Sequence, residues 1–202
     1  MRKSIVLTAM LTLAAVIGAQ PAQAQGISTW NRNWVIGASA GAASLSSDTQ
    51  PTLGAAVNWG LTPRIGIEAS STWMRRPAAD ETLSVAMTSQ VAIWRRESLT
   101  AFARGGVGAF VMTLNTNDDI PEFYRTRMAA LPSGSTRAFT DPSVVIGAGV
   151  DVRMSRHVHL RPSADVVTVV RDRRTMTVIM TAVQVAYHFE THRITPARAG
   201  TR

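Results

Sequence analysis

Cysteine is absent from this 202-residue sequence, and its absence excludes two classes of protein. The chain cannot build a disulfide framework, and it lacks the residue through which bacterial lipoproteins attach their lipid. Packing and hydrogen bonds must therefore stabilise the folded state.

Long apolar runs are also nearly absent, since the only one lies at the N-terminus. Arg2 and Lys3 precede an apolar stretch over residues 5–19, and Ala-Gln-Ala at residues 22–24 forms a small-residue cleavage site. The stretch is shorter than the roughly 20 residues that a membrane-spanning helix needs. We therefore predict an export signal peptide over residues 1–24, cleaved near Ala24, rather than a retained anchor.

Lysine occurs only once, at Lys3, so arginine carries nearly all of the positive charge that gives a formal net charge of +8. The arginines are spread singly or in pairs over the whole chain and do not form a patch interleaved with aromatic residues. Together with export, this pattern excludes nucleic acid as a partner. Anionic lipid headgroups or cell-surface phosphates are better candidates, although a genome that favours arginine codons would give the same composition.

Helical periodicity is scarce beyond the signal peptide, where apolar and polar residues instead alternate with a period of two. This alternation, interrupted by turn-forming residues, predicts an all-β chain. No linker divides residues 25–190, which we expect to form one domain followed by a polar tail over residues 191–202. The eight predicted strands are residues 34–43, 52–60, 65–74, 82–95, 100–113, 143–153, 158–170 and 177–189.

The connections between these strands alternate in character. They are long or polar after the first, third, fifth and seventh strands and tight after the second, fourth and sixth. This layout predicts an eight-stranded antiparallel up-and-down β-barrel with both chain ends at the short-turn end. A soluble sandwich would show no such regular alternation.

Charged residues fall on one face of the predicted strands, while the other face is apolar. The charged face is rich in Gly, Ala and Ser, as a crowded barrel interior requires. An arginine turned toward lipid would cost roughly 2–4 kcal/mol at the bilayer midplane, so we assign the apolar face to lipid and predict a transmembrane barrel. Residues of both signs would then neutralise one another in a lumen network: Glu68, Arg104, Asp151, Arg153, Arg161 and Asp165.

Aromatic residues support this assignment in part. By parity, Phe102, Phe110 and Trp94 fall on the polar face, where they either fill the lumen or mark a shift in register. The aromatic residues on the apolar face lie near strand ends, where the residues of a membrane-interface belt are expected. They are Trp34, Trp59, Trp73, Tyr187 and Phe189.

Several stretches resemble the small eight-stranded outer-membrane β-barrels of Gram-negative bacteria, of the OmpA transmembrane-domain and opacity-protein type. They are "GLTPRIGIEASSTW" (60–73), "AFARGGVGAF" (101–110), "VIGAGVDVRMSRHVHLRPSADV" (145–166) and the closing "VQVAYHF". The resemblance implies location in the outer membrane of a Gram-negative bacterium. It also implies that Phe189 is the C-terminal aromatic recognised by the outer-membrane assembly machinery. The tail after Phe189 departs from the family pattern.

The interior of an eight-stranded barrel is just wide enough for side chains to fill, so we do not expect a general pore. The sequence instead favours a non-enzymatic protein that stabilises the envelope or presents surface loops, with no cofactor. The oligomeric state is not predicted. The arginines expected at the rim of the barrel either contact lipopolysaccharide phosphates or are ordinary solvated residues. They are Arg75, Arg76, Arg125, Arg127, Arg137, Arg171, Arg173 and Arg174.

Two other functions are weighed against this one. A lipid A-modifying barrel enzyme would need a serine and a histidine within hydrogen-bond reach, but His159 and Ser163 are roughly 13 Å apart along one strand. A soluble periplasmic lipocalin-like barrel would bind a ligand inside and would invert the two faces.

Three histidines near the C-terminal end of the domain are weak candidates for a metal site. If the last two strands pair about the Asp-Arg-Arg-Thr segment, His159 faces His188 and His157 faces Glu190, all on the inner face. Zinc accepts such nitrogen and oxygen ligands. A hydrogen-bonded plug is the commoner role for such a cluster, so we predict no metal.

Overall fold

The computed structural model describes residues 33–45, 48–75, 81–117 and 120–189. The predicted signal peptide, its cleavage site and the polar tail lie outside these residues, as do Arg76 and Glu190. In the described part of the chain, no helix is both long and apolar enough to span a membrane.

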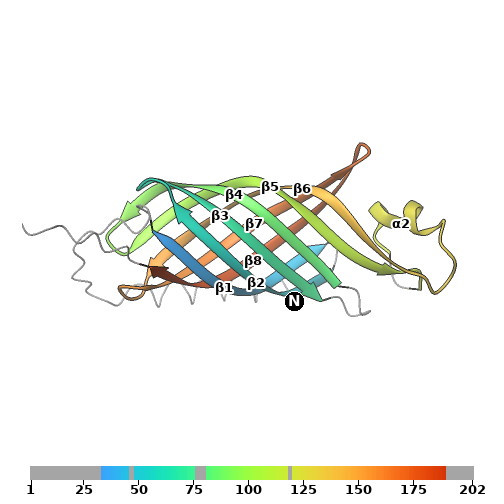
Figure 1. Ribbon diagram of the computed structural model, residues 1–202, viewed down its shortest axis with the longest axis horizontal. Helices are drawn as coiled ribbons and strands as arrows, with labels where there is room; N and C mark the ends of the chain where they lie inside the picture. The colour runs from blue at the N-terminus through green and yellow to red at the C-terminus, as the bar shows by residue number, and fades with distance from the viewer. Residues whose placement is uncertain (1–32, 46–47, 76–80, 118–119, 190–202) are drawn as a thin grey trace, which may run out of the picture.

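Eight antiparallel strands form a closed barrel in which each strand pairs with the next in sequence (Figure 1). Strand β8 pairs with β1, and the pair Trp34 and Phe189 joins the start of β1 to the end of β8. This topology confirms the predicted up-and-down barrel. The strands are β1 (Trp34–Leu45), β2 (Asp48–Gly60), β3 (Ile65–Arg75), β4 (Glu81–Arg96), β5 (Leu99–Asn115), β6 (Thr136–Arg153), β7 (Val158–Arg171) and β8 (Arg174–Phe189).

Exposure alternates along the strands as the sequence predicts. In β4, Leu83, Val85 and Met87 are exposed, whereas Ser84 and Thr88 are buried. An outer surface of large apolar side chains around a polar interior is suited to lipid, so the fold is that of a transmembrane β-barrel. The inverted, lipocalin-like arrangement is wrong, because the apolar face points outward.

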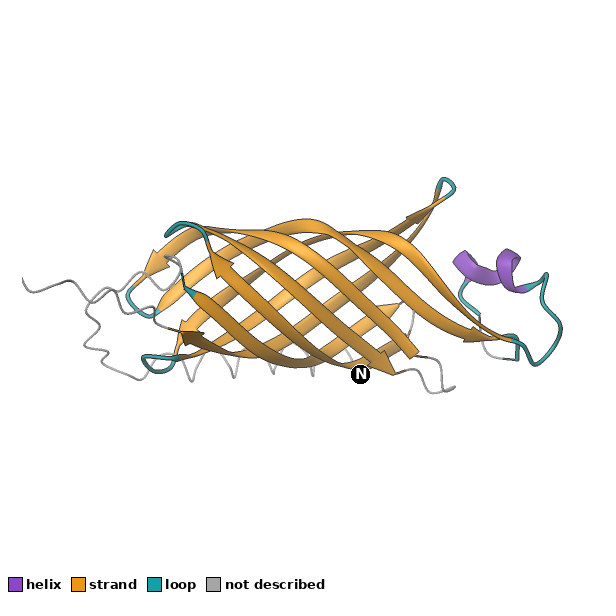
Figure 2. Ribbon diagram, viewed as in Figure 1, coloured by secondary structure: helices purple, strands orange, loops and turns teal. Residues whose placement is uncertain are grey.

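The hairpins at one end are longer than predicted. The sequence predicts a loop over residues 114–142, but β5 continues to Asn115 and β6 begins at Thr136. The short helix α2 (Glu122–Met128) lies within the remaining connection. The β5–β6 and β7–β8 hairpins therefore reach beyond the ends of β1–β4 at this end, which we call the outer end (Figures 1 and 2).

The connection between β7 and β8 is also shorter than predicted. Only Asp172 and Arg173 separate the strands, with φ angles of 47° and 65°. These angles are those of a two-residue type I′ turn. The turn moves the start of β8 to Arg174 and fixes the β7–β8 register.

A β-bulge in β4 produces the shift in register that is one of the two alternatives for Trp94. Ala92 pairs with Phe102 and Trp94 with Ala101, so Ile93 is an extra residue. The bulge turns Trp94 outward, where it is 46% exposed, although simple alternation places it on the inner face. Phe102 and Phe110 do fill the lumen, and each is 1% exposed.

Candidate functional site

The interior of the barrel contains a connected network of charged side chains, beginning at Arg104 on β5. Its Nε donates to Asp165 Oδ1 at 2.6 Å, and its Nη2 pairs with the second oxygen of the same carboxylate. Nη1 donates to Glu68 Oε1 at 2.7 Å. Arg104 therefore links β3, β5 and β7 across the lumen.

Arg161 on β7 continues the network on the other side of Glu68. Its Nη1 donates to Glu68 Oε2 at 3.1 Å, and its Nη2 donates to Gln90 Oε1 at 2.7 Å. Its Nε lies 3.5 Å from Asp151 Oδ2, and its guanidinium carbon is 4.9 Å from the centre of the Phe102 ring. Such pairing is what allows an arginine that is 3% exposed to remain inside the barrel.

Five of the six predicted network residues are thus brought together, and Arg153 is not. Arg153 is the last residue of β6, and its Nε donates to the backbone oxygen of Ser155 at 3.3 Å. Without it the network contains the carboxylates of Glu68, Asp151 and Asp165 against the guanidinium groups of Arg104 and Arg161. One negative charge is in excess within this group of five.

Glycines make room for the network where the strands pass close to it. A Cβ atom at Gly147 would overlap the Asp165 carboxylate, and one at Gly149 would lie 2.6 Å from the Phe102 ring. These inner positions explain the glycine-rich polar face of the sequence.

The lumen is filled rather than open. The buried guanidinium–carboxylate network crosses it, and beside the network a cavity of about 60 Å³ is lined by hydroxyl-bearing residues such as Ser70, Thr72 and Ser84. A space of this size holds a few water molecules. An apolar cluster that includes Phe110, Met112 and Met180 then fills the lumen toward the outer end.

Helix α2 packs against this apolar cluster. Tyr124 and Met128 are its buried residues, and they join Leu114, Phe139 and Val169 of the strands. The helix begins after Pro121, which suits a helix start because proline needs no amide hydrogen there. The apolar side of α2 thus continues the packing of the lumen beyond the end of the barrel.

Asp141 on β6 joins α2 to the strands. Both of its carboxylate oxygens accept hydrogen bonds from Arg127 of α2, and Oδ1 also accepts one from Arg171 of β7 at 2.7 Å. Its side chain is fully buried. Burial raises the pKa of the neighbouring Tyr124 phenol, and the negative charge of Asp141 raises it further.

The predicted rim arginines therefore have two different environments. Arg127 and Arg171 are bound to Asp141, and Arg125 pairs with Glu122 on the helix surface at 2.6 Å. The remaining rim arginines of the described residues are exposed and form no ion pair with a carboxylate there; they are Arg75, Arg137, Arg173 and Arg174.

The predicted aromatic belt is concentrated at the end of the barrel opposite the outer end. We call this the turn end, because short turns join β2 to β3, β4 to β5 and β6 to β7 there. Trp34 and Trp59 stack with ring centres 5.7 Å apart, and Tyr187 meets Phe189 edge to face at 5.0 Å. All four side chains are exposed, whereas Trp73, near the outer end, is only partly exposed.

The histidine candidates are arranged differently from the prediction. The actual register pairs His159 with Ala186 rather than with His188, because the β7–β8 turn is centred on Asp172 and Arg173, one residue earlier than predicted. His188 pairs through its backbone with His157, whose ring stacks on Tyr187. His159 and His188 still approach each other diagonally, with ring centres 3.8 Å apart. Asp151, which the sequence places in the lumen network alone, also contacts His159.

Comparisons with known proteins identify the fold. No protein-family model and no curated protein matches the sequence. Neisserial surface protein A has a TM-score of 0.59 at 11% identity, with 79% of this chain and 98% of that chain covered. The N-terminal β-barrel domain of OprF from Pseudomonas aeruginosa has a TM-score of 0.56 at 12% identity, with 77% and 97% covered.

The outer membrane protein OprG from Pseudomonas aeruginosa gives a TM-score of 0.51 at 11% identity, with 79% of this chain and 97% of that chain covered. At these identities the likeness shows the fold alone. It confirms the predicted resemblance to small outer-membrane β-barrels.

Proposed function

We propose that this protein is a non-enzymatic outer-membrane β-barrel without an open pore. The observation that carries the proposal is a filled lumen inside a barrel whose outer surface is apolar. Ile93, Val107 and Ile146, for example, are each at least 66% exposed, as lipid-facing residues would be. The protein would stabilise the envelope and hold its outer-end hairpins and α2 at the cell surface.

The closed lumen has a direct electrical test. Purified protein inserted into planar lipid bilayers should produce no stepwise conductance, because the charge network and the apolar cluster block the axis. A reproducible channel in the native protein would contradict the proposal. Localisation is tested separately, since the protein should fractionate with the outer membrane and need detergent for extraction.

The partner that we propose for the outer end is lipopolysaccharide. Exposed guanidinium groups at Arg75, Arg173 and Arg174 are not neutralised by carboxylates of the described residues, and arginine pairs bidentately with phosphate. In the alternative, these arginines are solvated and do not contact lipopolysaccharide phosphate. Arg171 and Arg127 are left out of this site because Asp141 binds them.

Matched triple variants separate the two alternatives. Replacing Arg75, Arg173 and Arg174 with glutamine should weaken binding of purified lipopolysaccharide to the folded protein by at least about tenfold, given the usual strength of charged hydrogen bonds. The control replaces three arginines at the opposite end with glutamine, and should leave binding unchanged: Arg64, Arg96 and Arg153. Equal affinities for both triple variants would reject specific contact at the outer end.

We also propose that the outer-membrane assembly machinery recognises Phe189. Phe189 is the last described residue, it ends β8 on the exposed face, and it pairs with Trp34. Phe189→Ala should slow insertion of the barrel in cells while leaving refolding into detergent nearly unchanged. Equal insertion rates would remove this role.

The enzymatic alternative gains no support from the site. Ser163 Oγ accepts a hydrogen bond from Arg104 at 3.3 Å, and His159 is bound to Asp151, so these residues do not form a Ser–His dyad.

A further inference from the structure

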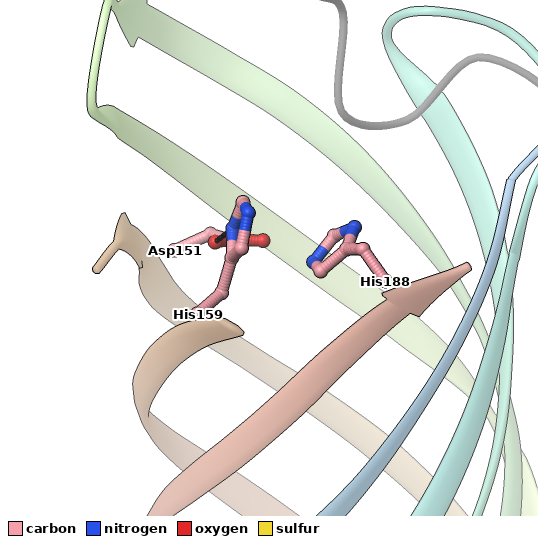
Figure 3. Close-up of side chains that lie close together, drawn as sticks. All are labelled: Asp151, His159 and His188. Carbon is pink, nitrogen blue, oxygen red and sulfur yellow. Dashed lines mark hydrogen bonds and ion pairs between the residues drawn. The ribbon is translucent and has the colours of Figure 1, made fainter. Parts of the chain in front are cut away.

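Asp151, His159 and His188 come together at the turn end of the lumen from three consecutive strands, β6, β7 and β8 (Figure 3). Each is at most 3% exposed. One potential ligand atom from each residue lies within 4.8 Å of the others. The cluster is thus compact, buried and built on strands rather than on loops.

The contact between Asp151 and His159 prepares one nitrogen for coordination. Asp151 Oδ1 lies 2.5 Å from His159 Nδ1, so the carboxylate accepts a hydrogen bond from Nδ1–H, and in the neutral ring Nε2 then carries the lone pair. This Nε2 atom is buried and has no hydrogen-bond partner among the residues that the structure describes. A carboxylate that orients a histidine in this way is typical of metal sites.

His188 supplies the second imidazole. Its ring centre is 3.8 Å from that of His159, with 31° between the ring planes. Figure 3 shows the two rings facing each other from neighbouring strands. Ligand atoms around a tetrahedral Zn²⁺ are about 3.4 Å apart and their rings diverge from the ion, so the two rings would turn away from each other as both nitrogens bind one ion.

The charge around the cluster also favours a cation. The network of Glu68, Arg104, Arg161, Asp165 and Asp151 carries one excess negative charge. Arg161 lies against Asp151 Oδ2, which leaves Oδ1 to His159. Arg161 and the more distant Arg95 weaken the attraction but do not occupy this oxygen.

We propose that His159 and His188 bind a late first-row divalent ion such as Zn²⁺ or Cu²⁺, with Asp151 orienting His159. Imidazole ligands suit these metals, and water would complete the coordination. The ion would join β7 to β8 at the turn end. The proposal is independent of lipopolysaccharide binding at the other end.

The test uses the mature chain without an affinity tag, folded in detergent. Titration with Zn²⁺ should raise the unfolding temperature and saturate at one ion per chain, and Cu²⁺ should give an electron paramagnetic resonance signal with coupling to two nitrogens. His188→Gln, which leaves the Asp151–His159 contact intact, should abolish both effects. Asp151→Asn should weaken binding about 10–100-fold, as loss of an orienting carboxylate does in other sites.

The remaining histidines provide the controls. His157→Gln removes the same side chain outside the cluster, and His192→Gln removes the histidine of the polar tail, which lies outside the described residues. Both variants should bind the ion as the native protein does. Absence of one-to-one binding by the native chain would overturn the proposal. Binding that survives in His188→Gln, or that is lost in either control variant, would overturn it as well.

Discussion

Asp141 of β6 and Arg127 of α2 form an ion pair in which the single nitrogen Nη1 of Arg127 lies 3.1 Å and 2.8 Å from the two carboxylate oxygens. Arg171 of β7 donates to the same carboxylate. This single buried acid therefore fixes α2 to two strands, while Tyr124 and Met128 supply the apolar packing beneath it. The outer end of the barrel is covered by a helix with both a polar and an apolar attachment.

Asp141→Asn should release α2 from the barrel. The substitution removes the charge that both arginines share, and local opening then exposes the helix to protease. Trypsin, which cuts after arginine, should cleave at Arg125 and Arg127 at least about tenfold faster than in the native protein. Glu122→Gln is the control, because its pair with Arg125 is highly exposed and should contribute little. Equal cleavage of the Asp141→Asn variant and the native protein would show that apolar packing alone holds α2.

The phenol of Tyr124 should report the same attachment. Its pKa is raised above its ordinary value by burial, first of all, and then by Asp141. Because the folded-state pKa is above the unfolded one, the stability this group confers is present below the unfolded value of about 10 and is lost as the pH rises through the folded one. In a Tyr187→Phe background, absorbance at 295 nm should show Tyr124 ionising well above pH 10 in the native protein, near pH 10 in urea, and at a lower pH than in the native protein after Asp141→Asn. Ionisation near pH 10 in the folded protein would contradict its burial.

The lumen network offers a comparison between two arginines. Arg104→Met leaves Glu68 and Asp165 buried without this partner, and should lower the free energy of unfolding by about 3–5 kcal/mol. Arg153→Met makes the same chemical change at a position outside the network and should have little effect. Urea unfolding in lipid vesicles, followed by tryptophan fluorescence, measures both variants. Similar midpoints for the two would show that the pairing of Arg104 contributes no net stability.

The fold could be predicted from the sequence because the two faces of each strand have different surroundings, lipid outside and polar side chains inside. Apolar and polar residues therefore alternate along the strands. The same reasoning places Glu68 and Arg104 on one inner surface, although no pattern in the sequence reports which charges meet. Arg153 has the correct parity, but it ends β6, where the chain turns and its Nε donates a hydrogen bond to the backbone oxygen of Ser155. Of the two alternatives for Trp94, the shift in register is correct, because the extra residue Ile93 reverses parity after the bulge.

The predicted register of β7 and β8 is two residues away from its actual value for a local reason. Type I′ turns usually contain glycine or asparagine, and the segment Arg171–Arg174 has neither. No residue in this segment therefore marks the centre of the turn, and a turn centred one residue later, between Arg173 and Arg174, pairs His159 with His188 directly. The diagonal approach of their rings follows from the turn at Asp172 and Arg173.

Gly147→Ala should disturb the network without changing any charge. The added Cβ overlaps the carboxylate of Asp165, which must move away from Arg104. We expect a loss of about 1–3 kcal/mol in the free energy of unfolding, as for other overpacked interiors. Gly105→Ala is the control, because only a backbone oxygen at 3.9 Å lies within 4 Å of its Cβ position. If both alanine variants unfold together with the native protein, the interior has more room than the structure shows.

Arg173→Gly should stabilise the barrel even though it removes a side chain. Arg173 has a φ of 65°, a conformation that costs a residue with a Cβ about 1–2 kcal/mol and costs glycine almost nothing. The variant also creates the Asp-Gly pair that type I′ turns prefer. Its urea midpoint should therefore rise, by an amount equivalent to about 1 kcal/mol. Arg174→Gly removes the same charge one residue later, in β8, and should lower stability by about 0.5–1 kcal/mol because glycine weakens a strand. If both variants shift the midpoint in the same direction, loss of charge rather than relief of backbone strain governs the turn.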